Sequence, residues 1–142
     1  MLNSVLINGL VFKKAFFFNQ NHFIVEDQDL FDSVGGVYAV YVKDVLQYIG
    51  SYSNTLQQRW INKRLDKFIH FKADLLKEMA KETNDEVYVY ALTRDSIREQ
   101  LFDSEYINQE SVESRLIEVI DPPMNVVRKN DKNKSSKSRS SN

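Results

Sequence analysis

Residues 36–60 read GVYAVYVKDVLQYIGSYSNTLQQRW, and the rest of the predicted fold is arranged around them. Apolar and polar residues alternate over 37–42 and again over 46–50, which is the pattern of two short strands with a tight connection. Residues 51–55 offer several helix N-cap side chains, so we expect a helix over about 56–68. The stretch therefore predicts a β-hairpin followed by a helix.

The length of the hairpin loop decides whether Tyr38 and Tyr48 share a face of the sheet. Opposed residues in an antiparallel pair have a constant index sum, and these two tyrosines share a face only if that sum is even. A two-residue turn at 43–44 would give an odd sum and place the tyrosines on opposite faces. We therefore expect a three-residue loop over 43–45, which sets Val40 opposite Tyr48 and leaves Tyr38 diagonal to Tyr48.

Four pieces of the sequence occur in the order that is typical of a known nuclease family. They are GVY at 36–38, YIG at 48–50, Arg59, and ESRLIEVIDPPMN at 113–125. This set resembles the GIY-YIG endonuclease family, in particular its small stand-alone phage or restriction-type members, and also the catalytic domain of its excision-repair members. The resemblance extends over residues 36–125.

The resemblance implies a divalent-metal-dependent endonuclease that hydrolyses DNA phosphodiester bonds. By motif, Tyr38 helps to activate the attacking water, Tyr48 lies beside it for proton transfer or orientation, and Arg59 holds the phosphate. Glu113 is implied to ligate the cation, and Asn125 to brace the site. The cation is expected to be Mg²⁺, or Mn²⁺ in its place, because a hard cation with one carboxylate and several waters suits phosphate substrates.

Basic residues follow Arg59 in the sequence and are the candidate contacts to DNA. Phosphate binding requires cationic side chains, so we assign substrate binding to Lys63, Arg64 and Lys67, with His70 and Asn125 beside them. No histidine follows Arg59 within one helical turn, where the family resemblance implies a further acid or phosphate ligand. Lys63, Tyr52 and His70 are the candidate substitutes.

Composition indicates one small, unexported domain. The chain has 142 residues, 42% of them hydrophobic and 27% charged, as in ordinary globular proteins. No apolar run approaches the roughly 18 to 20 residues of a membrane span, and no signal-like segment opens the chain, so we expect a cytoplasmic protein with no membrane contact, inside the host cell if phage-encoded. The absence of cysteine excludes disulfides and thiolate metal sites.

Charge is distributed unevenly along the chain. Residues 128–142 hold six Lys or Arg against one Asp, whereas residues 1–127 hold 13 basic residues against 19 acidic ones. The last segment has no periodicity, so we expect a disordered basic tail that either assists DNA binding or only solubilises the terminus.

The N-terminal residues, 1–34, are expected to form a β-rich extension to the nuclease-like domain at 35–127. Asn8-Gly9 predicts the turn of a separate hairpin. The run at 16–18 is all phenylalanine, which favours a core-facing surface, a substrate arm or a self-association surface.

The remaining segments predict an α/β fold of the α+β type, a small three-stranded antiparallel sheet flanked by helices. Helical spacing occurs over 72–83, strand alternation over 86–92 would add to the central hairpin, and a short helix with a loop is expected over 93–109. A last helix, capped near Ser111, should carry Glu113 on its apolar stripe and Glu118 on its exposed face.

Two alternatives to a DNA endonuclease remain open from the sequence. One is a nuclease-like nucleic-acid-binding module without turnover, although all four chemical positions are present; the other is a nuclease that acts on RNA. For a DNA enzyme we expect a homo-oligomer, a dimer or tetramer, because one site cuts one strand and two-fold assemblies are common.

Overall fold

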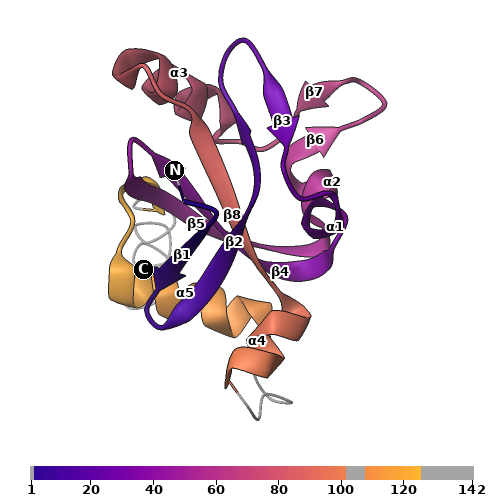
Figure 1. Ribbon diagram of the computed structural model, residues 1–142, viewed down its shortest axis with the longest axis vertical. Coiled ribbons are helices and arrows are strands. Elements are labelled where there is room, and N and C mark those ends of the chain that lie inside the picture. The colour runs from indigo at the N-terminus through magenta and orange to yellow at the C-terminus, as the bar shows by residue number, and fades with distance from the viewer. Residues whose placement is uncertain (1, 102–107, 126–142) are drawn as a thin grey trace, which may run out of the picture.

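The computed structural model describes residues 2–101 and 108–125. Six strands form one sheet in the order β1-β2-β8-β4-β5, with β3 paired to β2 and every pair antiparallel (Figure 1). The strands of this sheet are β1 (Ser4–Ile7), β2 (Leu10–Phe18), β3 (Phe23–Val25), β4 (Val34–Val42), β5 (Val45–Thr55) and β8 (Val87–Thr93). The mixed α/β class is confirmed, and the sheet is larger than the three strands predicted.

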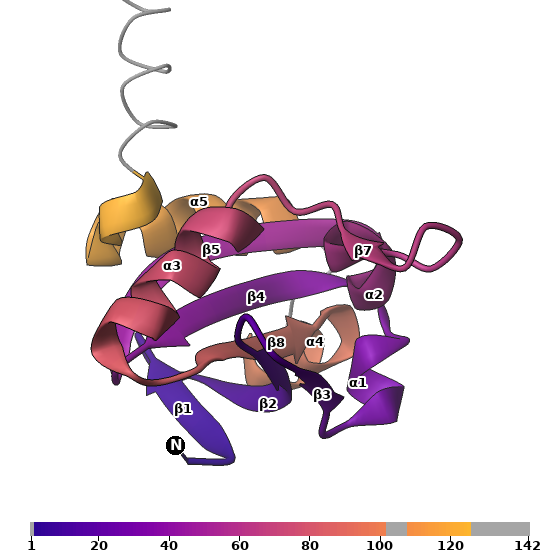
Figure 2. The same cartoon turned by 90° about the horizontal axis from the view of Figure 1, so that it is seen from above.

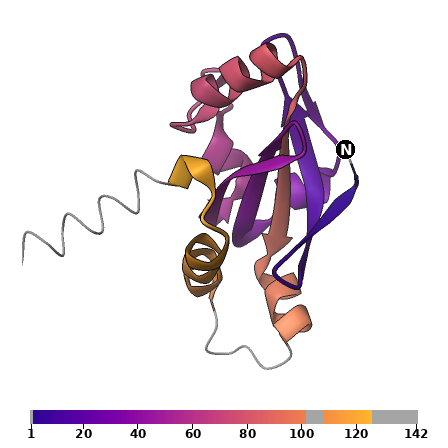
Figure 3. The ribbon, with the colours of Figure 1, turned by 90° about the vertical axis from the view of Figure 1, so that its left-hand side faces the viewer.

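Helices cover both faces of this sheet. One face packs against α1 (Gln28–Phe31), α2 (Leu56–Trp60) and α3 (Ala73–Thr83), and the other against α4 (Arg94–Leu101) and α5 (Gln109–Ile120). Figure 2 shows α3 in front of the strands with α5 behind them, and Figure 3 shows α5 end-on, followed by the short 3₁₀ helix η1 (Pro123–Asn125). Among the described residues, no helix has the length and apolar composition needed to cross a membrane.

The N-terminal hairpin belongs to the central sheet. Its turn forms at Asn8 and Gly9, both with positive φ, as the Asn-Gly pair predicts. The expectation of a separate hairpin is wrong, because β2 continues to Phe18 and pairs with β8. Phe16 and Phe18 have no exposed surface and belong to the core, whereas Phe17 between them is half-buried. The predicted basic tail at 128–142 lies outside the described residues.

The β4–β5 hairpin has the expected pairing of Val40 with Tyr48, but its loop differs from the one predicted. Lys43 and Asp44 form a two-residue turn with φ of 53° and 63°, so the predicted three-residue loop is wrong. A bulge at Gln47 then inserts one unpaired residue and restores the even index sum, so that Val40 lies opposite Tyr48. The two tyrosines therefore share a face.

The helix predicted over 56–68 ends after five residues, at Trp60. The chain turns back as a short hairpin, β6 (Ile61–Asn62) and β7 (Lys67–Phe68), in which Ile61 pairs with Phe68. Asn62 Oδ1 accepts a hydrogen bond from the Leu65 backbone at 3.2 Å and stabilises the turn. Ile61 and Phe68 are seven positions apart, a spacing that fits either two turns of a helix or the two strands of a hairpin. In the hairpin both side chains pack on the core.

Other predicted elements are confirmed within a few residues. They are the hairpin turn at 8–9, the helix over 72–83, the strand over 86–92, a short helix after 93 and the last helix. The last helix is capped by Asn108, whose side chain accepts from the Ser111 backbone at 2.8 Å. Glu113 is 4% exposed and Glu118 is exposed, as the helical stripe predicts.

Two motif glycines leave room for tyrosine rings of the neighbouring strand. A Cβ on Gly50 would collide with the ring and hydroxyl of Tyr38, which lies directly opposite in β4. A Cβ on Gly36 would lie 2.7 Å from the hydroxyl of Tyr52, its own partner in β5. Both strands therefore need glycine where an aromatic ring crosses them.

We predict that Gly50→Ala destabilises the fold by about 1–3 kcal/mol, because the buried Tyr38 ring must shift to admit a methyl group. Guanidinium unfolding measures this free energy. Ser53→Ala, an exposed change in the same strand, is the control and should stay within about 0.5 kcal/mol of the parent. Equal stability of the two variants would show that Tyr38 does not depend on the glycine.

Candidate active site

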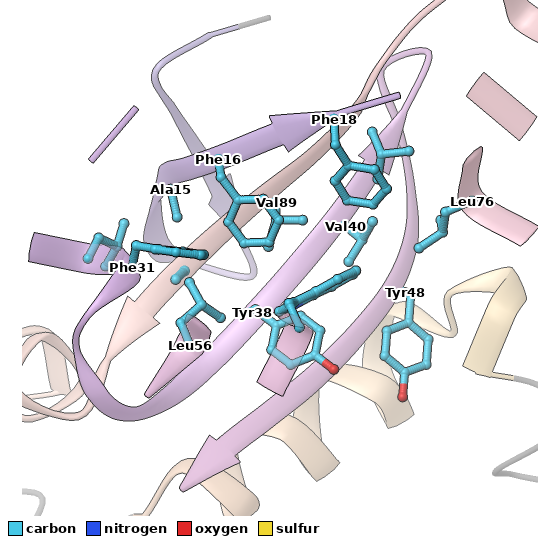
Figure 4. Packing of buried hydrophobic residues seen from close by; sticks show 14 of the residues in the cluster. Ala15, Phe16, Phe18, Phe31, Tyr38, Val40, Tyr48, Leu56, Leu76 and Val89 are labelled. Atoms are coloured by element: carbon cyan, nitrogen blue, oxygen red, sulfur yellow. The ribbon is translucent and has the colours of Figure 1, made fainter. Parts of the chain in front are cut away.

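The candidate site is built around Tyr38 of β4 and Tyr48 of β5. Their ring centroids lie 6.2 Å apart, and both residues are buried, with exposed fractions of 0% and 4%. Figure 4 shows both hydroxyl oxygens on the side of the rings away from Phe16 and Phe18. The two phenols thus leave the core in the same direction, as the sequence predicted.

His70, on the segment between β7 and α3, is the direct partner of Tyr38. Its Nε2 lies 2.6 Å from the Tyr38 hydroxyl, and its Nδ1 accepts a hydrogen bond from the Lys72 backbone N–H at 3.1 Å. A neutral imidazole that accepts at Nδ1 carries its proton on Nε2, so His70 donates to the Tyr38 oxygen. The tyrosine keeps its own proton free to donate elsewhere.

Burial keeps His70 neutral. The ring is 5% exposed and stacks on Trp60 with 4.0 Å between centroids. This burial, together with the positive charges of Arg59 and Lys72, lowers the pKa of His70 to about 3. The sequence suggested His70 as a substrate contact, whereas in the structure it is buried and hydrogen-bonded to Tyr38.

The other candidate catalytic residues lie within electrostatic range of Tyr38. Burial raises the pKa of the Tyr38 phenol well above its ordinary value, and the charge and hydrogen bonding of Arg59 oppose this rise. Tyr48 and Glu113 raise the pKa of Tyr38 further. The structure therefore brings all four residues together, and it keeps Tyr38 protonated at neutral pH.

Arg59 is the exposed member of this group. It lies on α2, whose first turn is held by a capping box between Thr55 and Gln58. Its neighbour Trp60 is fully buried and anchors the helix, while the Arg59 residue is exposed and its side chain still hydrogen-bonds to Tyr38. Arg59 borders an open, largely polar pocket of about 290 Å³ that is lined in addition by Ser51, Tyr52, Ser53, Asn54, Thr55, Gln58 and Ile69.

Glu113 is contributed by α5, which packs on the other face of the sheet from α2. It lies between Val112 and Leu116 of the buried stripe, and its carboxylate acts on the pKa of Tyr38. Within residues 2–101 and 108–125, no group of three His, Asp or Glu side chains gathers as a ready-made metal cage. A single buried carboxylate suits a cation that keeps most of its waters, as Mg²⁺ does.

Asn125 braces the strand that carries Tyr48. It is fully buried, its Oδ1 accepts from the Ile49 N–H and its Nδ2 donates to the Ile49 carbonyl, both at 3.0 Å. These bonds satisfy the outer edge of β5, which has no further strand beside it. The sequence suggested two roles for Asn125, substrate binding and bracing of the site, and the hydrogen bonds to Ile49 correspond to the second.

The predicted basic contacts lie on the β6–β7 hairpin. Lys63 and Arg64 are in its turn and Lys67 is in β7, and all three side chains are exposed. Lys63 and Arg64 line a second open pocket, of about 510 Å³, which shares Gln58 and Ile69 with the pocket at Arg59. The cations therefore continue the surface that begins at Arg59, although not along a helix.

Tyr52 and Phe71 complete the surroundings of the tyrosine pair. Tyr52 lies 6.5 Å from the Tyr38 ring, and its hydroxyl is 2.8 Å from Ser33 Oγ, so it is engaged elsewhere. Phe71 stacks on His70, and sequence reasoning missed it because no periodic pattern covers the segment 69–72. Tyr48, Gly50 and Tyr52 alternate along one strand, and this alternation is the sequence signal that places Tyr52 on the same face as Tyr48.

The chain matched no protein-family model, no curated protein and no solved structure.

We predict that His70 makes the fold sensitive to mild acid. Below pH 6.5 the unfolded histidine takes up a proton, whereas the folded one resists until about pH 3, so stability falls as the pH decreases through this window. The loss at pH 5.0 should be about 2 kcal/mol.

Guanidinium unfolding at pH 7.5 and 5.0 measures this loss. His70→Gln should lose about 2 kcal/mol less than the parent between the two pH values. Identical pH dependence in the parent and in His70→Gln would contradict the buried neutral histidine.

Proposed function

We propose that the chain is a divalent-metal-dependent endonuclease that hydrolyses DNA phosphodiester bonds, of the type found in the GIY-YIG family. One observation carries the proposal: Arg59, Tyr48 and Glu113, from three separate elements, all act on the ionisation of Tyr38. A fold could bury one tyrosine for packing alone. Convergence of a second phenol, a guanidinium and a buried carboxylate on its hydroxyl supplies the groups that phosphodiester hydrolysis needs.

In this mechanism Arg59 meets the substrate first, because Tyr38 has no exposed surface. The guanidinium binds the scissile phosphate in a bidentate manner, and its movement toward the phosphate uncovers the phenol. Once uncovered, the Tyr38 phenol releases its own proton to solvent water, and the resulting phenolate accepts the proton of the attacking water. The N–H of His70 and the charge of Arg59 stabilise that phenolate, and Tyr48 orients the water.

Glu113 fits the role of ligand for Mg²⁺ or Mn²⁺. Its carboxylate is 4% exposed and lies within electrostatic range of Tyr38, and a hard cation that keeps most of its waters needs only one such protein ligand. When bound there, the cation supplies Lewis-acid stabilisation of the charge that develops on the phosphate. Glu113 holds it, and Asn125 fixes the strand from which Tyr48 projects.

DNA is held beside the site by the cations of the β6–β7 hairpin. All three, Lys63, Arg64 and Lys67, are exposed, and Lys63 and Arg64 line the second pocket, which shares residues with the one at Arg59. Phosphates on either side of the scissile bond thus meet positive charge in a chain whose first 127 residues are acidic overall.

We predict that the protein converts supercoiled plasmid to nicked or linear DNA with Mg²⁺, and that EDTA stops it. Glu113→Gln should lower the cleavage rate by about 10²-fold or more while the fold remains, because it removes the charge and keeps the volume. Gel analysis of plasmid over time measures both rates.

Glu118→Gln is the matched control for this experiment. It makes the same change on the exposed face of α5 and should leave the cleavage rate within about two-fold of the parent. Plasmid that stays supercoiled with either metal over a range of salt would overturn the nuclease proposal. Equal losses in the two variants would overturn the role of Glu113.

A further inference from the structure

Phe71 is an exposed aromatic residue at the border of the candidate site. It is 65% exposed, and its ring lies 5.9 Å from Tyr48 in an edge-to-face arrangement. Figure 2 shows the connection between β7 and α3, which contains this residue, passing above β5. Single exposed apolar residues are common on protein surfaces, so exposure alone assigns no role. The aromatic rings that pack against Phe71 distinguish it from the other exposed apolar residues.

Phe71 is the outermost of three stacked rings. Its ring is 20° from parallel to His70 at 5.0 Å, and His70 is 11° from parallel to Trp60 at 4.0 Å. Trp60 is fully buried, so the column runs from the core to the surface. A flat aromatic face at the surface is thereby held at a fixed angle.

Hydrogen bonds keep the segment that presents Phe71 in place. The His70 side chain accepts from the Lys72 N–H, and the His70 carbonyl accepts from the Ala73 N–H at 3.0 Å. Both bonds span Phe71, and the second leads into α3. The phenyl ring is therefore pre-organised, which lowers the entropic cost of binding a flat ligand.

A cation accompanies the exposed ring. The Lys72 ammonium lies 5.3 Å from the Phe71 centroid. Leu65, Ile69 and Leu75 are exposed in the same part of the chain, but they are aliphatic and belong to no ring stack. An exposed aromatic face beside a lysine is the combination by which proteins bind single-stranded nucleic acid.

We propose that Phe71 is a stacking platform for one unpaired nucleobase of the substrate strand, and that Lys72 contacts the phosphate of the same nucleotide. This inference rests on the proposed function and names its substrate class. A base stacked on the ring displaces the Lys72 ammonium from it, and the exchange is favourable because stacking of a base contributes more than an exposed cation–π contact.

The platform has a consequence for the kind of DNA that is cut. A base inside a duplex is stacked on both sides and cannot reach Phe71 without leaving the helix. The site therefore prefers strands that are single, gapped or mismatched next to the scissile phosphate. Tyr48 lies between the platform and Tyr38, so the stacked nucleotide is adjacent to the reacting one.

Binding of fluorescent oligonucleotides in EDTA tests the platform without cleavage. The probes are a thymidine 12-mer and an abasic 12-mer with the same number of phosphates, followed by fluorescence anisotropy. The parent should bind the thymidine probe more tightly. Phe71→Ala should weaken that binding about 5-fold to 150-fold, which corresponds to roughly 1–3 kcal/mol, and leave the abasic probe unchanged.

Three further variants complete the test. Phe71→Tyr keeps a flat ring and should retain the preference for the thymidine probe. Leu75→Ala removes a side chain of similar exposure, 52%, and should bind both probes as the parent does. Lys72→Ala should weaken both probes alike, because both carry phosphates. Unfolding curves of all variants should agree with the parent, since the altered side chains reach the surface.

The outcomes separate this inference from the proposed function. Equal affinity of the parent for both probes, or of Phe71→Ala and the parent for the thymidine probe, overturns the platform even if plasmid is cut. Loss of both probes in Phe71→Ala overturns it too, because it would point to general disruption of the surface. A base-dependent contact at Phe71 in a protein that leaves both plasmid and gapped DNA intact supports the platform and overturns only the nuclease.

Discussion

The structure depends on the burial of one tyrosine across a glycine. The ring of Tyr38 lies over Gly50 of the neighbouring strand, and its hydroxyl has no access to water. A buried phenol without a partner would cost about 1–3 kcal/mol, so the fold must bring a hydrogen-bonding group to it. His70 is such a group, and the chain reaches it by ending α2 at Trp60 and returning through the β6–β7 hairpin.

The same burial sets the electrostatics of the site. Desolvation disfavours the charged form of both partners, so it raises the pKa of Tyr38 and lowers that of His70. The result is a neutral hydrogen-bonded pair at neutral pH. In the proposed reaction this pair is the resting state, and positive charge brought by the substrate complex is what makes a phenolate accessible. Acid acts on the pair through the histidine, which ties the stability of the fold to the state of the site.

Aromatic stacking connects this buried pair to the surface. Trp60, His70 and Phe71 form one column, so the residue that orients Tyr38 also supports the exposed ring. If the nucleobase platform operates, substrate contact at Phe71 and proton transfer at Tyr38 are coupled through a single imidazole. A rigid column transmits position well because aromatic rings have few rotatable bonds.

The sequence alone determined the elements whose signals are local, and the residues they carry. The Asn8-Gly9 turn, the helix over 72–83, the strand over 86–92 and the inward face of Glu113 follow from backbone preferences and from the periods of helices and strands. The resemblance to a nuclease family nominated Tyr38, Tyr48, Arg59 and Glu113, and the structure brings the last three within electrostatic range of Tyr38. Their activity stays a proposal.

Only the tertiary structure decided the features that depend on contacts between distant segments. Pairing of β2 with β8 made the N-terminal hairpin part of the sheet, because Phe16 and Phe18 bury their rings only there. A bulge at Gln47, and not a longer loop, aligned the tyrosines, since a tight turn and an even register can coexist when one residue is left unpaired. The partnership of Tyr38 with His70 spans 32 positions, and no local preference encodes a hydrogen bond formed to satisfy a group that burial has removed from water.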